Sequence, residues 1–145
     1  MATLKKSVNR IKQFNFELAL LKILRENDNI IIDLNTDDQL FKFGIDSSGN
    51  KLAPYRSTEY ERLKAQLNPN HVTDLKLEGD FYKGWKVDAD KFPIYMTSTD
   101  AKTAELVGKY GEDIFGLTDK NMGALSDYIV DDIRETLRKK ALGIS

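Results

Sequence analysis

Gly44-Ile45-Asp46-Ser47-Ser48-Gly49 opens the stretch of sequence that decides the fold. Further along, this stretch contains Tyr55, Ser57-Thr58-Glu59-Tyr60, Lys64 and Leu77-Glu78-Gly79-Asp80-Phe81-Tyr82. Turn-forming residues from Asp46 to Pro54 predict a loop. Ser57 has the chemistry of a helix N-cap, and it predicts a short helix that stops near Leu67, before Pro69. The stretch therefore specifies a turn, a helix and an aromatic strand, which is information about shape.

Upstream of this stretch the sequence predicts helices. From Leu4 to Leu24 there is no Pro or Gly, and apolar residues recur at spacings of three and four, which predicts one amphipathic helix. Asn27 to Asn29 should break or bend it. Ile30 to Phe43 has helical spacing, although Ile30-Ile31-Ile32 alone would suit a strand and Thr36-Asp37-Asp38-Gln39 has the form of a capping box. We favour a second helix that ends at Gly44, in a left-handed terminal position.

Downstream, we expect a β-hairpin followed by helices. The hairpin should pair Phe81 to Val87 with Phe92 to Thr97 across a turn at Ala89-Asp90-Lys91. A helix should start at Thr99 or Asp100 and stop at Tyr110-Gly111. Thr118 should cap the last helix. Its apolar seam is formed by Met122, Leu125, Ile129, Ile133 and Leu137.

These elements together predict the α+β class, with long N- and C-terminal helices around a small antiparallel β element and one or two short helices. We expect one domain over residues 1–145. Within it lie an N-terminal helical arm (1–27), a middle region with loop, short helix and hairpin (44–98), and C-terminal helices (99–145).

The amino-acid composition argues against several classes of protein function. The 145 residues include no cysteine, so neither a disulfide framework nor a cysteine-ligated metal is expected. A net charge of −1 gives the whole molecule no preference for nucleic acid or membranes. No run of about eighteen apolar residues is present, so we expect no membrane span.

The search for reactive groups predicts no catalytic, cofactor-binding or metal-binding residue. His71 is the only histidine, and we interpret it as an exposed loop residue. Asp33-x-Asn35-x-Asp37 begins like a calcium loop, but Asp38 and Gly44 occupy the positions of the required Gly and Glu. The adjacent acids Asp37-Asp38 and Asp131-Asp132 diverge on a helix, which favours a solvated face.

Nucleic-acid binding has two weak signals. A stacking platform for single strands could use the aromatic residues Phe81, Tyr82, Trp85, Phe92 and Tyr95. We favour the hairpin core for this set, because Asp80, Asp88 and Asp90 would repel phosphates. The basic segment Met1 to Lys12 could touch DNA in a channel, but a solubilising helix face is the simpler interpretation.

The decisive stretch resembles the tail-completion and head-to-tail connector proteins of tailed phages, notably those of phages and prophages from Bacteroidetes hosts. The likeness covers about Leu40 to Tyr128, and its specific parts are Gly44 to Lys64 and Leu75 to Tyr82. It continues through Tyr110-Gly111-Glu112-Asp113-Ile114-Phe115-Gly116-Leu117-Thr118. Two positions depart from the family pattern: Glu78 stands for its Thr, and Gly84 for a Ser.

This resemblance implies a structural virion protein without catalytic residues, localised to the neck or tail and to the host cytoplasm during assembly. It implies a homo-oligomeric ring of six or twelve copies. The ring would contact neighbouring portal, connector or tail proteins, with a passing contact with channel DNA and none with membranes. Aromatic residues dominate such contacts, so we expect packing or interface anchors at Tyr55, Tyr60, Phe81, Tyr82 and Trp85.

Two alternatives remain open. One is a small cytoplasmic binding or adaptor protein, such as a toxin–antitoxin or regulatory partner. The other is a phage nuclease or hydrolase that uses clustered carboxylates and a metal ion.

Overall fold

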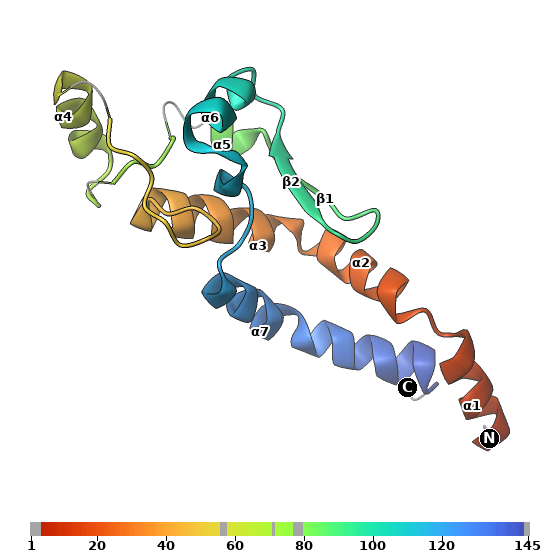
Figure 1. The fold of residues 1–145 in the computed structure, drawn as a ribbon. Helices are drawn as coiled ribbons and strands as arrows, with labels where there is room; N and C mark the ends of the chain where they lie inside the picture. Colours follow the sequence, from red (N-terminus) through yellow and green to blue (C-terminus); the bar gives the residue numbers. More distant parts are fainter. Residues whose placement is uncertain (1–3, 56–57, 71, 77–79, 144–145) are drawn as a thin grey trace.

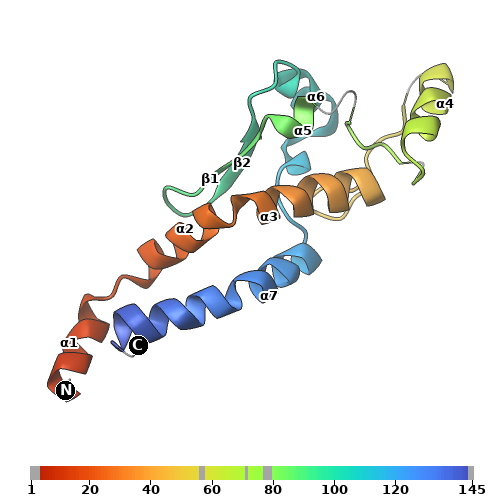
Figure 2. The ribbon, with the colours of Figure 1, turned by 180° about the vertical axis from the view of Figure 1, so that it is seen from behind.

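A computed structural model describes residues 4–55, 58–70, 72–76 and 80–143. Its centre is a helical spine, which we define as α2 (Phe16–Glu26), α3 (Asp28–Asp33) and the π-helix η1 (Leu34–Phe43). In Figures 1 and 2 the spine lies between a β-hairpin on one side and α7 (Asp119–Thr136) on the other. The mixed helix-and-sheet class expected from the sequence is confirmed.

The expected single helix over residues 4–24 is wrong, because the chain forms two helices there. α1 (Leu4–Gln13) ends before Phe14, and α2 starts at Phe16. The side-chain oxygen of Asn15 accepts a hydrogen bond from the Leu18 backbone N–H (3.1 Å) and so caps α2. This cap provides a helix start without any Pro or Gly. The expected break at Asn27 is confirmed, since this residue separates α2 from α3.

The helix preferred for residues 30–43 is confirmed, as is its end at Gly44. Gly44 has φ 62° and ψ 38°, and its N–H bonds to the Leu40 carbonyl (3.0 Å). The capping-box interpretation of Thr36 is wrong, because this residue lies inside η1 and its hydroxyl donates to the Ile32 carbonyl (2.9 Å). After Gly44 the expected loop follows, held by the Asp46 carboxylate, which accepts from two loop N–H groups. α4 (Thr58–Leu67) then spans the expected short helix, while its predicted cap at Ser57 lies outside the described residues.

The hairpin is confirmed but shorter than expected. β1 (Trp85–Asp88) pairs antiparallel with β2 (Tyr95–Ser98). The prediction that the first strand starts at Phe81 is wrong, because residues 80–83 form the helical turn α5 (Asp80–Lys83). The Tyr82 and Trp85 rings meet edge-on, with centroids 6.0 Å apart. A strand would point residues three apart to opposite faces, so this contact requires the turn.

The C-terminal part follows the expected order. α6 (Thr103–Tyr110) starts three residues later than Asp100 and stops at Gly111, and a 3-10 turn, η2 (Glu112–Ile114), follows. Thr118 caps α7 by accepting from the Asn121 N–H (3.2 Å), as expected. The chain continues from α7 into the short π-helix η3 (Leu137–Ala141). α1 and the C-terminal end lie together at one end of the molecule, and α4 lies at the other (Figures 1 and 2).

Two apolar clusters hold these elements together. The first packs α2 against α7 and the hairpin turn, through Leu21, Leu24, Ala89, Leu125 and Ile129. The second lies beneath the hairpin. It consists of Leu40, Leu75, Trp85 and Ile114. The seam predicted for α7 therefore reaches the core at Leu125 and Ile129, whereas Met122 is 50% exposed.

Candidate functional site

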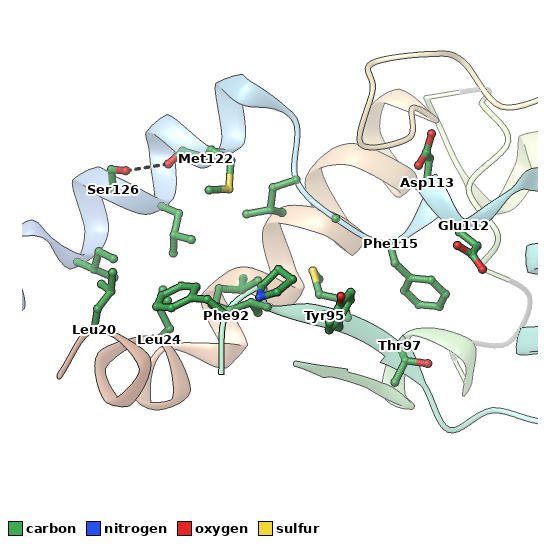
Figure 3. A pocket seen from close by; sticks show the side chains of 18 of the residues that line it. Leu20, Leu24, Phe92, Tyr95, Thr97, Glu112, Asp113, Phe115, Met122 and Ser126 are labelled. Carbon is green, nitrogen blue, oxygen red and sulfur yellow. Dashed lines mark hydrogen bonds between the residues drawn. The ribbon is translucent and has the colours of Figure 1, made fainter. Parts of the chain in front are cut away.

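An apolar groove of about 1010 Å³ runs between α7 and the hairpin, with the spine as its floor (Figure 3). Leu20, Leu24 and Ile31 of the spine contribute to the floor. The α7 wall presents Met122, Leu125, Ser126, Ile129 and Ile133. The opposite wall comes from residues 92–97, which form the end of the hairpin loop and the start of β2.

Large apolar side chains stand at the groove with much of their surface in solvent. Met122 is 50% exposed, Tyr95 62% and Phe92 39%. The charged groups among the described lining residues are Glu112 and Asp113, both carboxylates at the end of the groove beside Phe115. A concave apolar surface of this kind is a candidate binding site. Sequence reasoning missed the groove, because it is formed by segments far apart in the chain.

Three buried side-chain amides fix the α7 wall, and we call Asn35, Gln39 and Asn121 the amide bracket. Asn35 donates to the Ile114 carbonyl (3.0 Å) and accepts from the Gly116 N–H (2.7 Å). Gln39 donates to the Gly116 carbonyl (2.9 Å) and accepts from the Thr118 N–H (2.8 Å).

The third member of the amide bracket ties α7 itself to the spine. The Asn121 amide donates to the Gln39 side-chain oxygen (3.0 Å) and to the Leu34 carbonyl (3.1 Å). The three amides are at most 3% exposed. Buried amides that hydrogen-bond to two segments hold them together rigidly, so the bracket sets how the start of α7 lies against the spine.

A second polar cluster surrounds a buried ion pair between Lys64 of α4 and Asp74. The Lys64 ammonium lies 2.6 Å from Asp74 Oδ1, and the side chains are only 4% and 1% exposed. The Asn68 amide donates to Asp74 Oδ2 (2.8 Å), and the Lys76 N–H donates to Oδ1 (2.8 Å). Both carboxylate oxygens are therefore occupied by donors from the protein. Such a cluster fastens α4 to the segment around Asp74.

Two tyrosines complete this cluster. The Tyr55 hydroxyl donates to Asp74 Oδ1 (3.3 Å), and the Tyr82 hydroxyl donates to the Asp74 carbonyl. Burial, followed by the neighbouring Asp74 charge, raises the pKa of Tyr82 above its ordinary value. Burial also raises the pKa of Tyr55. Both phenols thus remain protonated donors at neutral pH.

The structure places four of the predicted anchor residues in two ring contacts, and Asp74 accepts a hydrogen bond from one tyrosine of each. Tyr55 and Tyr60 form an edge-to-face pair with ring centroids 5.0 Å apart. Tyr82 contacts Trp85, which is 4% exposed and packs on Phe115 with centroids 4.6 Å apart. These four residues pack within the chain. The side chain of the fifth, Phe81, lies outside the described residues.

The expectation that all five hairpin aromatics form a core is wrong for Phe92 and Tyr95, which lie exposed at the groove. Among the described residues, no group of three or more His, Cys, Asp or Glu side chains could hold a metal ion. Asn35, from the calcium-like pattern, belongs to the amide bracket, while His71 lies outside the described residues. Asp131 is solvent-exposed and pairs with Arg134 (3.6 Å).

Within the described ranges, no helix combines the length and the apolar composition needed to cross a membrane. Comparisons with protein-family models, with curated proteins and with solved structures found no significant match. The groove, the amide bracket and the buried ion pair are therefore the observations on which a functional proposal rests.

Proposed function

We propose that this protein is a structural subunit of a tailed-phage or prophage virion, which forms a ring in the head-to-tail connector or neck or completes the tail. The observation that carries the proposal is the apolar groove, which is lined in part by the exposed side chains of Met122, Phe92 and Tyr95. In a ring, each subunit must present one surface that receives its neighbour. The resemblance of residues 40–128 to connector proteins supplies the biological setting.

The composition of the groove favours a macromolecular occupant over a small molecule. Small-molecule sites combine an apolar lining with a few convergent polar groups that fix orientation. Here the carboxylates Glu112 and Asp113 are both exposed and lie at one end, and the lining of α7 is apolar except for Ser126. The Ser126 hydroxyl already donates to the Met122 carbonyl (3.0 Å). An apolar protein element would fill the remaining surface.

Additional exposed apolar residues extend this reasoning beyond the groove. Leu63 and Leu67 lie four residues apart on α4 and are 52% and 60% exposed. Residues at this spacing share one helix face. The α4 end of the molecule thus offers a second apolar surface, which we assign to a neighbouring virion protein.

The same groove would also serve a small adaptor that binds an amphipathic helix of one partner, and this is the second candidate. Native mass spectrometry of the full chain over a concentration series distinguishes the two functions. A closed ring, and peptides of this chain in purified particles, are expected for the connector subunit. A chain that stays monomeric at high concentration and is absent from particles contradicts the proposal. A monomer that binds one partner at equal stoichiometry favours the adaptor.

A further inference from the structure

We infer that the groove receives α1 from a second copy of this chain, in a head-to-tail contact. The inference rests on the proposed ring and names the element that would close it. Its basis is an amphipathic helix with a partly exposed apolar face, together with a groove of opposite charge that is long enough to hold that helix.

Part of the apolar face of α1 is exposed in its own chain. Val8 is 40% exposed and Ile11 is 49% exposed, and their spacing of three places them on one side of the helix. The apolar surface continues past the break, with Phe16 48% and Leu18 60% exposed. Amphipathic helices bind apolar grooves through anchors at this spacing.

The charges of the two surfaces are opposite. The ten residues of α1 include Lys5, Lys6, Arg10 and Lys12 and no acidic residue. The charged groups among the described lining residues of the groove are the carboxylates of Glu112 and Asp113. Opposite charges steer association and fix orientation. We therefore place the N-terminal turn of the incoming α1, which also carries the positive end of the helix dipole, beside these carboxylates.

The groove is also long enough for the whole helix. A helix of ten residues is about 15 Å long. On α7 alone the groove extends from Met122 to Ile133, a distance of about 16 Å at the same rise per residue, and its lining continues to Glu112. With its N-terminal turn at Glu112, the incoming helix would set Val8 near Met122 and Ile11 further along the wall.

The structure favours a second copy over the chain's own α1. In its own chain, α1 lies against η3 at the far end of α7 (Figures 1 and 2). Arg10 fills the space beside Gly143. A Cβ added to this glycine would lie only 1.5 Å from the Nη1 atom of Arg10. This contact directs α1 away from the middle of its own groove. Because the two surfaces differ, the contact is heterologous, and it generates a ring when its rotation closes.

Cysteine pairing tests this arrangement directly, since the chain has no cysteine of its own. One preparation carries Val8→Cys and the other Met122→Cys, and the two are mixed under mild oxidation. A disulfide-linked heterodimer is expected. The matched control replaces Met122→Cys with Tyr128→Cys, which is also exposed on α7 (63%) but is not among the described lining residues. This control pair should give no heterodimer above background.

Charge and packing variants give an independent readout. Val8→Glu should weaken subunit association by about tenfold or more, because it removes a buried apolar side chain from the contact. Lys5→Glu should weaken association, and Glu112→Lys in the same chain should restore it. Circular dichroism of each variant confirms that the helices remain.

Each outcome has a separate meaning. A ring mass that persists in Val8→Glu, without the Val8–Met122 cross-link, overturns α1 docking but leaves the proposed ring intact. A chain carrying both cysteines that closes an intramolecular disulfide places α1 in its own groove and also overturns the inference. A cross-link from Met122→Cys to a different virion protein alone does so as well. Failure of the unmodified chain to assemble or enter particles refutes the proposed function itself.

Discussion

The buried pair between Lys64 and Asp74 makes the sharpest energetic prediction. Asp74→Asn keeps the size of the side chain but removes the charge that the ammonium faces at 2.6 Å. Lys64 is 4% exposed, so water cannot replace the carboxylate. The new amide would also place an N–H or a weaker acceptor against Asn68, which now donates to Oδ2 (2.8 Å). Breaking one partner of a buried pair costs about 3–5 kcal/mol.

This loss should be measured by urea unfolding followed by circular dichroism. With a slope of about 2 kcal/mol per molar urea, the unfolding midpoint should fall by roughly 2 M. Lys64→Met should cost less, because Asp74 keeps its hydrogen bonds from Asn68, Tyr55 and the Lys76 N–H. The double variant should cost less than the sum of the two single variants.

The chain contains a matched control for this experiment. Lys139 and Glu135 approach to the same distance, 2.6 Å, but their side chains are 60% and 62% exposed. Lys139→Met should leave the midpoint indistinguishable from that of the parent, since solvent screens exposed pairs. An Asp74→Asn variant that loses less than about 1 kcal/mol would refute the reasoning, because a buried pair would then behave like a surface pair.

Further predictions concern the backbone, pH and the groove wall. Gly44→Ala should cost about 2–4 kcal/mol in urea unfolding, because its Cβ would lie 2.7 Å from the Val72 side chain at φ +62°. Gly49→Ala, at φ +82° with open space around it, should cost only about 1 kcal/mol, and equal losses would contradict this reasoning. Burial raises the pKa of Tyr82, so the unfolded chain releases this proton near pH 10 while the folded chain retains it. Its contribution to stability is complete below pH 10 and then falls by about 1.4 kcal/mol per pH unit, a slope that Tyr82→Phe should remove from alkaline urea titrations. Gln39→Leu should leave backbone groups of the α7 linker unpaired and cost about 2–4 kcal/mol. Hydrogen exchange should then accelerate in α7 more than in the hairpin, and a uniform increase would argue against a local joint.

Features set by local chemistry could be predicted from the sequence. Gly44 ends its helix because a left-handed residue is needed there, and Thr118 starts α7 because its hydroxyl accepts a backbone N–H. The break before α2 was missed, although Asn15 is a strong N-cap residue, because the apolar spacing continues across it. The early strand start at Phe81 followed aromatic β-propensity, which the packing of Tyr82 overrides.

Features set by tertiary contacts could not be predicted in the same way. In the sequence, Asn35 and Gln39 look like ordinary polar residues of a helix. They form a bracket only because the fold brings residues 114–118 within hydrogen-bonding distance of them. The buried ion pair of Lys64 and Asp74 does leave one signal in the sequence. Tyr60, Lys64 and Asn68 are spaced by four, so these polar side chains follow one side of α4 to the residue just beyond its end. A polar face can nonetheless be the buried one when its partners, here Asp74, come from another segment.

The amide bracket also constrains how this chain can diverge. Four of its hydrogen bonds end on main-chain atoms of Ile114, the last residue of η2, and of Gly116 and Thr118 in the linker that leads to α7. These four bonds do not depend on the linker side chains, but φ 126° favours glycine at position 116, Phe115 packs on Trp85, and Thr118 caps α7. Inserting or deleting one residue would instead move every partner out of reach. The linker acts as a spacer of fixed length, so the interval from Ile114 to Asn121 should persist in relatives whose composition has drifted.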